Sequence, residues 1–443
     1  MSASMSGAAA NALPWGMPGS TAIVPVRPLK VGVLVDLALT AEAGGHVKCW
    51  QRLAEAAVGY ADRLDLTVHF SGPEARRIDL SPSVRYVVLP PVLSTARLVR
   101  EVPDHTDLAP WHPGLARALA NYDVIHTTDA FFCYARTATR FVRRHGVPMV
   151  SSIHTNTPEY ARITTAKLLE RKLGRGLAYR AASDFLGLPH RVDALLQRRL
   201  ARHLAGATSA MAGFGGVSDA RYHSRHCGIA LRRGLDHARF TPERRDRSRF
   251  ERRFGLPPGH LVAMYAGKLN AGKNVPLLAD IIDRVRRAGV PVQLFCAGSG
   301  SEQASLEAAL GPALTCPGPL GQEELARAYA SADLFLFPSM IDEWGNAAVE
   351  ALGAGLPALI AAGSGVANGL ADCPGLRVLP GDRPEPWAAA IVELAAAPQQ
   401  RADMARAARA YVEAHIPNWA EVLGDDLLPV WQAAHGSRPG RRG

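Results

Sequence analysis

The sequence predicts an α/β protein with two doubly wound parallel sheets, and two observations carry this prediction. Short apolar runs alternate with amphipathic helical stretches, which is the pattern of parallel strands joined by crossover helices. The alternation restarts near residue 261, and a chain of 443 residues is too long for one ordinary core. Two Rossmann-like domains that face each other place a ligand cleft between the carboxyl ends of their strands.

The predicted elements follow this alternation in order. The first series of strands is expected at residues 29–39, 64–70, 84–90, 122–128 and 147–155. A long, basic helical stretch from about Pro158 to about His203 comes next, and the charged residues 242–258 (TPERRDRSRFERRFGLP) are predicted to be a linker. The second series of strands is expected at residues 261–267, 292–298, 313–318, 333–339 and 356–362. The chain closes with the helices AAAIVELAAA, ADMARAARAYVEAHI and NWAEVLGDDLLPVWQAA.

These patterns divide the chain into four parts. They are a disordered tail, a first Rossmann-like domain, a second Rossmann-like domain and a closing helix with its tail, at residues 1–22, 23–245, 246–415 and 416–443. The small, polar N-terminus lacks a basic region followed by an apolar core, so no signal peptide is expected. No apolar run reaches the roughly 18 residues that span a bilayer. The six scattered cysteines include no C-x-x-C, which favours reduced thiols and a cytoplasmic location.

The positive charge of the chain is concentrated in one segment. The formal net charge is +10. Residues 162–253 hold 21 Lys and Arg against 8 Asp and Glu, so this segment carries +13 and the remainder carries −3. Such a segment suits an anionic membrane surface or a phosphorylated substrate, and arginines that only solvate their helices are an equal alternative. Nucleic acid is not an expected partner, because few aromatic residues accompany the arginines.

The stretch YAGKLNAGKN (265–274) comes within one residue of a P-loop. Gly267 to Lys273 reads G-x-x-x-x-G-K, but Asn274 stands where a P-loop carries the Ser or Thr that ligates Mg²⁺. A second interpretation does not require this hydroxyl ligand. Lys268 and Lys273 are two cations at a strand-to-helix turn, whose backbone N–H groups and positive helix end help to neutralise a diphosphate without metal. We favour this second interpretation.

Two carboxylates follow about seventy residues later, in PSMIDEWGNAAVEALGAGLPALI (338–360). Asp342 and Glu350 are eight residues apart and bracket a turn at Gly345 and Asn346, which follows a strand and opens a helix. With Asp342 on the loop and Glu350 about one turn into the helix, both carboxylates can face one cleft. One can accept hydrogen bonds from a sugar and the other from a ribose, while the helix N-terminus points at phosphates.

Together these stretches resemble the family-4 retaining glycosyltransferases of the GT-B fold. In the second half, YAGKLNAGKN is similar to the family's basic signature, LFCAGSGSEQASLEAAL to its VGDGP…LE element, ELARAYASADLFLFPS to its ELxxxYxxADxFVFPS element, and DEWGNAAVEALGAGLPALI to its E-x7-E motif. In the first half, VLVDLALTAEAGGHVKCW resembles the first strand and Gly-Gly loop, and VIHTTDAFF, VSSIHTNTPEY and RRGLDHARFTP resemble further elements. The resemblance covers about residues 29–435.

The resemblance implies a role for each matched residue. Lys268, where the family usually has arginine, and Lys273 would bind the diphosphate of the donor. Asp342, where glutamate is usual, would contact the donor hexose, and Glu350 would hold the ribose. His154 matches the histidine that family members place beside the transferred sugar. The further implied donor-binding positions are Gly44, Gly45, Gly298, Leu320, Trp344, Gly345 and Asn346.

The implied reaction transfers a hexose of the mannose or glucose type, with retention, from a UDP- or GDP-linked donor to an acceptor hydroxyl. A membrane lipid, a lipid-linked molecule or a polysaccharide is the expected acceptor. The implied GT-B fold also leads us to expect the closing helices to cross back to the first domain. If the basic segment binds lipid, the protein docks peripherally at the inner face of the cell membrane.

No metal ion or other cofactor is expected. A D-x-D motif is missing from the right place, and His223, His226 and Cys227 have no carboxylate partner nearby in the sequence. Two alternatives to a transferase stay open. One is another GT-B nucleotide-sugar enzyme, such as an epimerase or a phosphorylase, although no good pyridoxal-bearing lysine is evident for a phosphorylase. The other is a P-loop nucleotide-binding protein.

Overall fold

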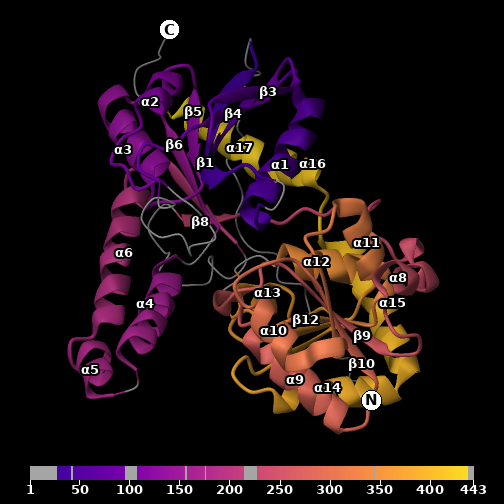
Figure 1. Cartoon of the computed structure of the whole chain (residues 1–443). Coiled ribbons are helices and arrows are strands. Elements are labelled where there is room, and N and C mark those ends of the chain that lie inside the picture. The colour runs from indigo at the N-terminus through magenta and orange to yellow at the C-terminus, as the bar shows by residue number, and fades with distance from the viewer. Residues whose placement is uncertain are drawn as a thin grey trace, which may run out of the picture.

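The computed structural model contains two α/β units, and Figure 1 shows them coloured along the chain. The structure describes residues 27–40, 43–94, 107–154, 157–174, 176–213, 227–340, 342 and 345–437. The tail predicted for residues 1–22 lies outside the described residues, as do Trp344, His223 and His226.

The first unit is built on an eight-stranded sheet in the order β3-β4-β2-β1-β5-β6-β7-β8. Neighbouring strands are parallel except β3 and β4. The strands are β1 Leu29–Ala38, β2 Leu64–Ser71, β3 Arg76–Ser81, β4 Val84–Leu89, β5 Val124–Thr127, β6 Met149–Ile153, β7 Ser209–Ala212 and β8 Cys227–Ala230. The five strands predicted for this half are present. The sequence did not predict β3, β7 or β8, and β3 is an antiparallel edge strand whose residues are exposed or half-buried.

The helices of the first unit include a long hairpin. They are α1 Gly45–Ala57, α2 Pro113–Leu119, α3 Cys133–His145, α4 Thr157–Leu173, α5 Leu177–Arg180 and α6 Leu188–Leu204. The helical stretch predicted from about Pro158 to about His203 folds back on itself, so that α4 and α6 pack side by side with α5 at the far end (Figure 1). We call residues 157–204 the arm. It starts directly after β6 and extends away from the sheet.

The second unit is a six-stranded parallel sheet in the order β11-β10-β9-β12-β13-β14. Its strands are β9 Leu261–Ala266, β10 Val292–Ala297, β11 Leu314–Gly318, β12 Leu334–Phe337, β13 Ala358–Ala361 and β14 Leu376–Leu379. Its helices are α8 Arg247–Phe254, α9 Pro276–Arg287, α10 Gln303–Leu310, α11 Gln322–Ser331, α12 Asn346–Gly353, α13 Gly365–Gly369, α14 Glu385–Ala396 and α15 Pro398–His415. Strands β9, β10, β12 and β13 are buried along their whole length, as expected for a sheet covered by helices on both faces.

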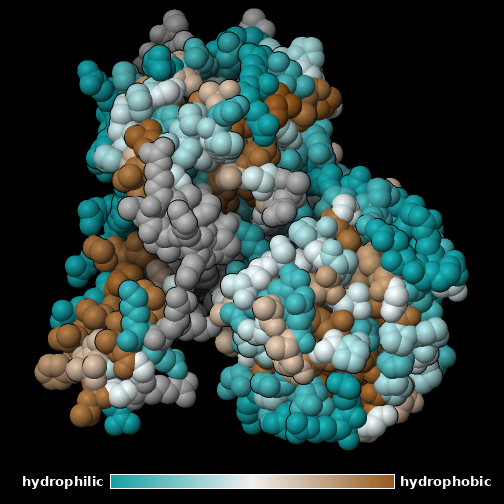
Figure 2. Space-filling model, in the orientation of Figure 1, coloured by the Kyte–Doolittle hydropathy of each residue, from teal (hydrophilic) through white to brown (hydrophobic). Residues whose placement is uncertain are grey.

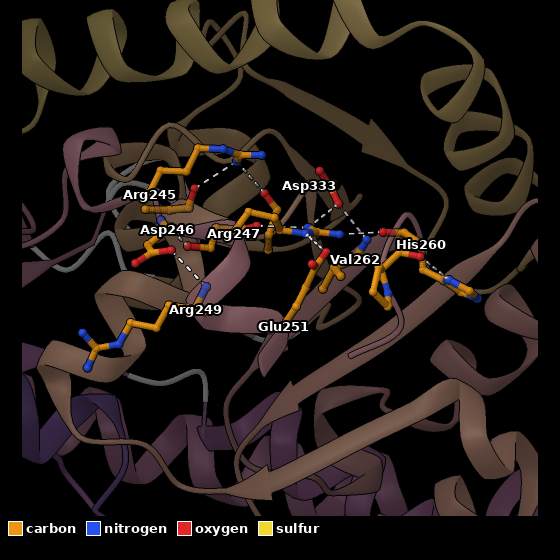
Figure 3. A network of polar contacts seen from close by, with 12 residues as sticks. Arg245, Asp246, Arg247, Arg249, Glu251, His260, Val262 and Asp333 are labelled. Carbon is orange, nitrogen blue, oxygen red and sulfur yellow. Dashed lines mark hydrogen bonds and ion pairs between the residues drawn. The ribbon is translucent and has the colours of Figure 1, made fainter. Parts of the chain in front are cut away.

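The predicted linker at 242–258 is wrong, because this segment is part of the second unit. It contains helix α8, whose Phe250 is buried in the core. Arg247 donates to Asp333 (2.8 Å), Glu251 (2.7 Å) and the carbonyl of His260 (2.6 Å), as Figure 3 shows. This helix has a side chain in the core, and its arginine links it to the residues just before β9 and β12, so it is fixed to the sheet. The predicted domain boundary at residues 245/246 stays a prediction.

The last helices leave the second unit and pack on the first. Helix α15 lies against α12, and α16 Trp419–Glu421 and α17 Leu428–Gly436 then cross back, where the yellow end of the chain lies beside α1 and β5 in Figure 1. Leu423, Leu427 and Trp431 are fully buried in the same core as Trp50 of α1. The chain therefore passes between the two units twice, once after β8 and once after α15.

Candidate active site

Two helix N-termini from different units meet at the centre of the site. Helix α1 begins after Gly44 and helix α12 begins after Gly345, so both N-cap residues are glycines that have no side chain to cap the first N–H groups. Asn346 Nδ2 donates to the carbonyl of Gly45 across the two units at 3.2 Å. Converging helix N-termini concentrate partial positive charge and backbone donors, which favours an anion between them.

Lys268 comes from the second unit and lies over this meeting point. A methyl group at Gly44 would lie 3.8 Å from Lys268 Cε and 4.0 Å from its Nζ. The turn that carries Lys268 is held against the loop after β10, because Leu269 N–H donates to Ser299 O at 2.9 Å. A Cβ at Gly298 would lie only 1.9 Å from Gly267 O, so Gly298 permits this close approach of two loops. Gly298 therefore supports the position of Lys268.

Lys273 and Asp342 form an ion pair beside the same turn. Lys273 ends a short 3-10 helix, Ala271–Lys273, whose N-cap Asn270 accepts from Lys273 N–H at 3.0 Å. The two side chains are about a quarter to a third exposed, so the pair borders the cleft. The ammonium and the carboxylate hold each other in position, and a donor that binds here meets both charges.

The geometry of Asn274 argues against a P-loop. Its backbone has a left-handed conformation (φ 56°), and helix α9 begins only at Pro276. The Asn274 side chain donates to Gly381 O at 2.7 Å and to Pro338 O at 3.2 Å. The residue that would ligate Mg²⁺ in a P-loop thus links the turn, by hydrogen bonds, to residues that follow two other strands of the sheet.

Glu350 lies on α12, about one turn after Asn346, as the sequence predicted. Its carboxylate accepts a long hydrogen bond from Tyr329 Oη (3.4 Å), which comes from α11. Burial raises the pKa of Glu350 to about 7, although Lys48 and Arg52 of α1 oppose this rise electrostatically. Arg52 also donates to Gln322 Oε1 at 2.8 Å, which is a second polar contact between the units. Burial therefore favours the neutral form of this carboxyl more strongly than water does.

His154 lies at the end of β6 and stacks on His46 of α1. The two rings are 4.3 Å apart at an angle of 13°. His154 Nε2 hydrogen-bonds Ser152 Oγ at 2.8 Å, and burial lowers the pKa of His154 well below its ordinary value. The stacked pair adjoins the N-terminus of α1, so His154 is a neutral imidazole next to the proposed anion site.

The predicted site residues do not all meet. Gly44 lies close to Lys268, Gly45 contacts Asn346, and Lys273 pairs with Asp342. Glu350 lies on the same helix as Asn346, and Gly345 is the N-cap of that helix. Leu320 packs its side chain against the hydrophobic core of the second unit.

The sequence analysis missed residues that surround the site. They are His46, Lys48 and Arg52 of α1, and Tyr329 of α11. The spacing of Lys48 and Arg52, which are four apart and follow the Gly-Gly loop by one turn, is a signal that could have placed them on one face of α1.

Comparisons with known proteins agree with this architecture. Residues 260–397 match the family model described as "Glycosyl transferases group 1". The chain is 27% identical over 402 residues to the D-inositol 3-phosphate glycosyltransferase of Streptomyces griseus, covering 84% of this chain and 82% of the relative. It is 29% identical over 252 residues to the GDP-mannose-dependent alpha-mannosyltransferase of Mycolicibacterium smegmatis, covering 57% and 59%. Its fold is similar to sucrose-phosphate synthase of Thermosynechococcus elongatus, with a TM-score of 0.65, 17% identity and coverage of 89% and 96%.

Two facing α/β units, joined by helices that cross back, define the class of GT-B enzymes that use nucleotide-sugar donors. Residues 260–397 match the group 1 glycosyltransferases, and the relative that aligns over most of the chain is also a glycosyltransferase. In the described part of the chain, no helix is long and apolar enough to cross a membrane.

Proposed function

We propose that the chain transfers a hexose of the mannose or glucose type from a UDP- or GDP-sugar to an acceptor hydroxyl, with retention of the anomeric configuration. The acceptor is a membrane lipid, a lipid-linked molecule or a glycan. The relatives named above are a glycosyltransferase of inositol phosphate and a mannosyltransferase that depends on GDP-mannose, which supports a hexose donor.

One observation carries the proposal for the donor site. Two helix N-termini with glycine N-caps converge with Lys268, and the pair of Lys273 and Asp342 lies beside the same turn. A departing nucleotide diphosphate develops negative charge, and preorganised cations and N–H donors stabilise that charge without a metal ion. The diphosphate lies between Gly44 and Asn346 in this proposal.

The two carboxylates orient the donor. Asp342 contacts the hexose hydroxyls from the loop before α12, and Glu350 accepts hydrogen bonds from the ribose. In a retaining transfer the acceptor attacks from the face of the departing phosphate, so these carboxylates are not a glycosidase-type acid/base pair. His154 donates to or accepts from the transferred sugar at the first unit's side of the cleft.

Nucleotide binding tests the donor proposal. Calorimetry with UDP, GDP, ADP and ATP, each with Mg²⁺ and with EDTA, is expected to show a preference for UDP or GDP that survives EDTA. Binding that requires ATP and Mg²⁺ would instead identify the turn at Lys273 as a P-loop. Turnover of the preferred sugar nucleotide without any acceptor, giving an isomerised sugar, would identify an epimerase.

The exposed residues at the tip of the arm support the proposal that the acceptor lies at a membrane surface. Leu177 and Phe185 at its tip are 85% and 89% exposed, and Figure 2 shows apolar residues gathered over this end of the arm. Residues 170–191 hold five Lys and Arg against two Asp and Glu. Apolar side chains among cations suit the boundary of an anionic bilayer, whereas two such tips would repel each other in a dimer.

Vesicle binding tests the role of the arm. Partial burial of Leu177 and Phe185 in the bilayer contributes about 1 kcal/mol each, and each nearby Lys or Arg contributes about 1 kcal/mol on an anionic surface. Replacement of both tip residues by serine is expected to weaken cosedimentation with phosphatidylglycerol-containing vesicles by about 10- to 30-fold. Nucleotide binding should not change, because neither tip residue is among the proposed donor-binding residues.

The matched control is Val378→Ser, which removes a 43% exposed apolar side chain from β14 of the second unit. This variant should bind vesicles like the original chain. Equal binding of the original chain to pure phosphatidylcholine vesicles, with no gain from the anionic lipid, would refute docking on an anionic surface.

A further inference from the structure

A buried chain of hydrogen bonds runs from the last helix of the protein to His154. Trp431 Nε1 donates to His126 Nδ1 at 2.9 Å, which links α17 to β5. His126 Nε2 lies 2.8 Å from Ser152 Oγ, and Ser152 Oγ lies 2.8 Å from His154 Nε2. Trp431, His126 and Ser152 are fully buried and His154 is 7% exposed, so water does not compete for these bonds.

The chemistry of Trp431 determines which atom donates and which accepts in each of these hydrogen bonds. An indole Nε1–H can only donate, so His126 Nδ1 must accept. Burial lowers the pKa of His126 to about 3, and a neutral imidazole carries a single proton. The proton of His126 is therefore on Nε2, where it is donated to Ser152 Oγ.

The hydrogen bond from Ser152 determines which ring nitrogen of His154 is protonated. Among the residues that the structure describes, Ser152 Oγ hydrogen-bonds His126 and His154. Because it accepts from His126, its own O–H is left to donate to His154 Nε2. Acceptance from both histidines would leave a buried hydroxyl proton without an acceptor, which costs more than a normal hydrogen bond contributes. His154 Nε2 is thus an acceptor.

We propose that Trp431, through His126 and Ser152, acts as a positioning residue that holds His154 in the tautomer protonated on Nδ1. The helix that crosses back from the second unit thereby sets which nitrogen of His154 donates a hydrogen bond. Trp50 supports the arrangement, since its ring packs edge-on against His126 with centroids 5.0 Å apart. His154 Nδ1 is buried in this structure, so its N–H would donate to a sugar hydroxyl oxygen only where the bound sugar displaces the groups that cover it, whereas the other tautomer would present a lone pair from the same atom.

The direct test observes the tautomers by NMR with ¹⁵N-histidine labelling. Long-range ¹H–¹⁵N spectra distinguish protonated from unprotonated ring nitrogens, and a His154→Gln sample assigns the signals of His154. The original chain is expected to show a protonated Nδ1 and an unprotonated Nε2 for His154. A protonated Nε2 there would overturn the proposal, whatever reaction the enzyme performs.

Two variants interrupt the series of hydrogen bonds at different residues. Trp431→Phe keeps an aromatic ring but removes the N–H, so both His126 and His154 should show mixed tautomers. Ser152→Ala should leave His126 protonated on Nε2, and only His154 should show mixed tautomers. The matched control is Trp387→Phe, which removes an equivalent indole bond (2.7 Å to Pro380 O) from a fully buried tryptophan of the second unit. Unchanged His154 signals in Trp431→Phe would refute the proposal.

A kinetic readout follows, and it rests on the proposed function. Loss of one fixed hydrogen-bond donor at the sugar should lower kcat/KM about 5- to 10-fold in Trp431→Phe and in Ser152→Ala, but not in Trp387→Phe. An altered tautomer with unaltered kcat/KM would support the relay and contradict the role of His154 in the proposed function. Unaltered tautomers with lowered kcat/KM would contradict the relay alone.

Discussion

Replacement of Glu350 by glutamine should weaken donor binding while it makes the protein more stable. Both effects follow from one feature of the structure, the burial that raises the pKa of this carboxyl from its ordinary 4.5 to about 7. Glutamine keeps the shape and the hydrogen-bonding carbonyl of a protonated glutamate, but it has no charge and no proton equilibrium.

The stability effect has a definite sign. Between pH 4.5 and about 7 the unfolded chain ionises Glu350 and the folded chain does not, so the folded state loses about 1.4 kcal/mol of relative stability per pH unit. The loss is complete above about pH 7 and amounts to about 3 kcal/mol. Glu350→Gln should therefore melt like the original chain near pH 4.5 and higher at pH 8, by about 5–10 °C for a domain of this size.

The binding effect runs the other way. If the ionised carboxylate accepts hydrogen bonds from the ribose, it is about 9% populated at pH 6 and about 90% at pH 8, so the affinity of the original chain should rise about 10-fold over this range. In Glu350→Gln the affinity should be independent of pH and about 10-fold weaker at pH 8, because a charged acceptor is lost.

Calorimetry with the intact nucleotide sugar at pH 6, 7 and 8 measures the affinity, since its diphosphate does not titrate in this window. The control Glu307→Gln changes an exposed carboxylate on α10 and should alter neither quantity. If Glu350→Gln melts lower than the original chain at pH 8, or keeps the original pH dependence of binding, the assigned environment of Glu350 is wrong.

Further substitutions test the rest of the site. Asp342→Asn and Lys273→Ala each break the ion pair; both should lower kcat/KM by about 10-fold or more, and full transfer activity in Asp342→Ala would disprove the assignment of Asp342. Gly345→Ala should lower stability by about 3 kcal/mol or more in thermal unfolding, because its φ is 51° and the new methyl would lie 2.4 Å from Val366 Cγ2. Gly363→Ala, with φ 85° but open space around it, should cost only the backbone strain of about 1–2 kcal/mol.

The two-sheet architecture could be predicted because buried parallel strands leave an unmistakable apolar signal. Leu261–Ala266 and Val292–Ala297 are buried at every position, so period-two alternation was not needed to find them. The edge strand Arg76–Ser81 lacks this signal, because it pairs on one side only and faces solvent. Residues 242–258 were misinterpreted since their arginines look solvated, whereas Arg247 in fact donates hydrogen bonds to three partly buried groups.

The donor-site residues could be predicted from turn chemistry and resemblance, but the relay could not. The residue pair Gly345 and Asn346 predicts the start of a helix from the sequence alone. Trp431 and His126 are 305 residues apart and belong to different predicted parts of the chain, so no local pattern connects them. Sequence periodicity reports which face of an element is buried, and it does not report which polar atoms meet once two elements pack.

The stretch from Asp342 to Glu350 combines several features that lower the stability of the empty protein. Gly345 has a left-handed backbone, helix α12 starts without a side-chain cap, and Glu350 is a partly buried carboxyl whose pKa is raised. A glycine N-cap in place of a capping side chain costs a few tenths of a kcal/mol, and the raised pKa of the Glu350 carboxyl costs about 3 kcal/mol at pH 8. A diphosphate would supply acceptors for the uncapped N–H groups, and a ribose would supply donors for the carboxylate. In the proposed function one ligand would offset both deficits, so a segment that is costly to fold would also be suited to bind a nucleotide sugar.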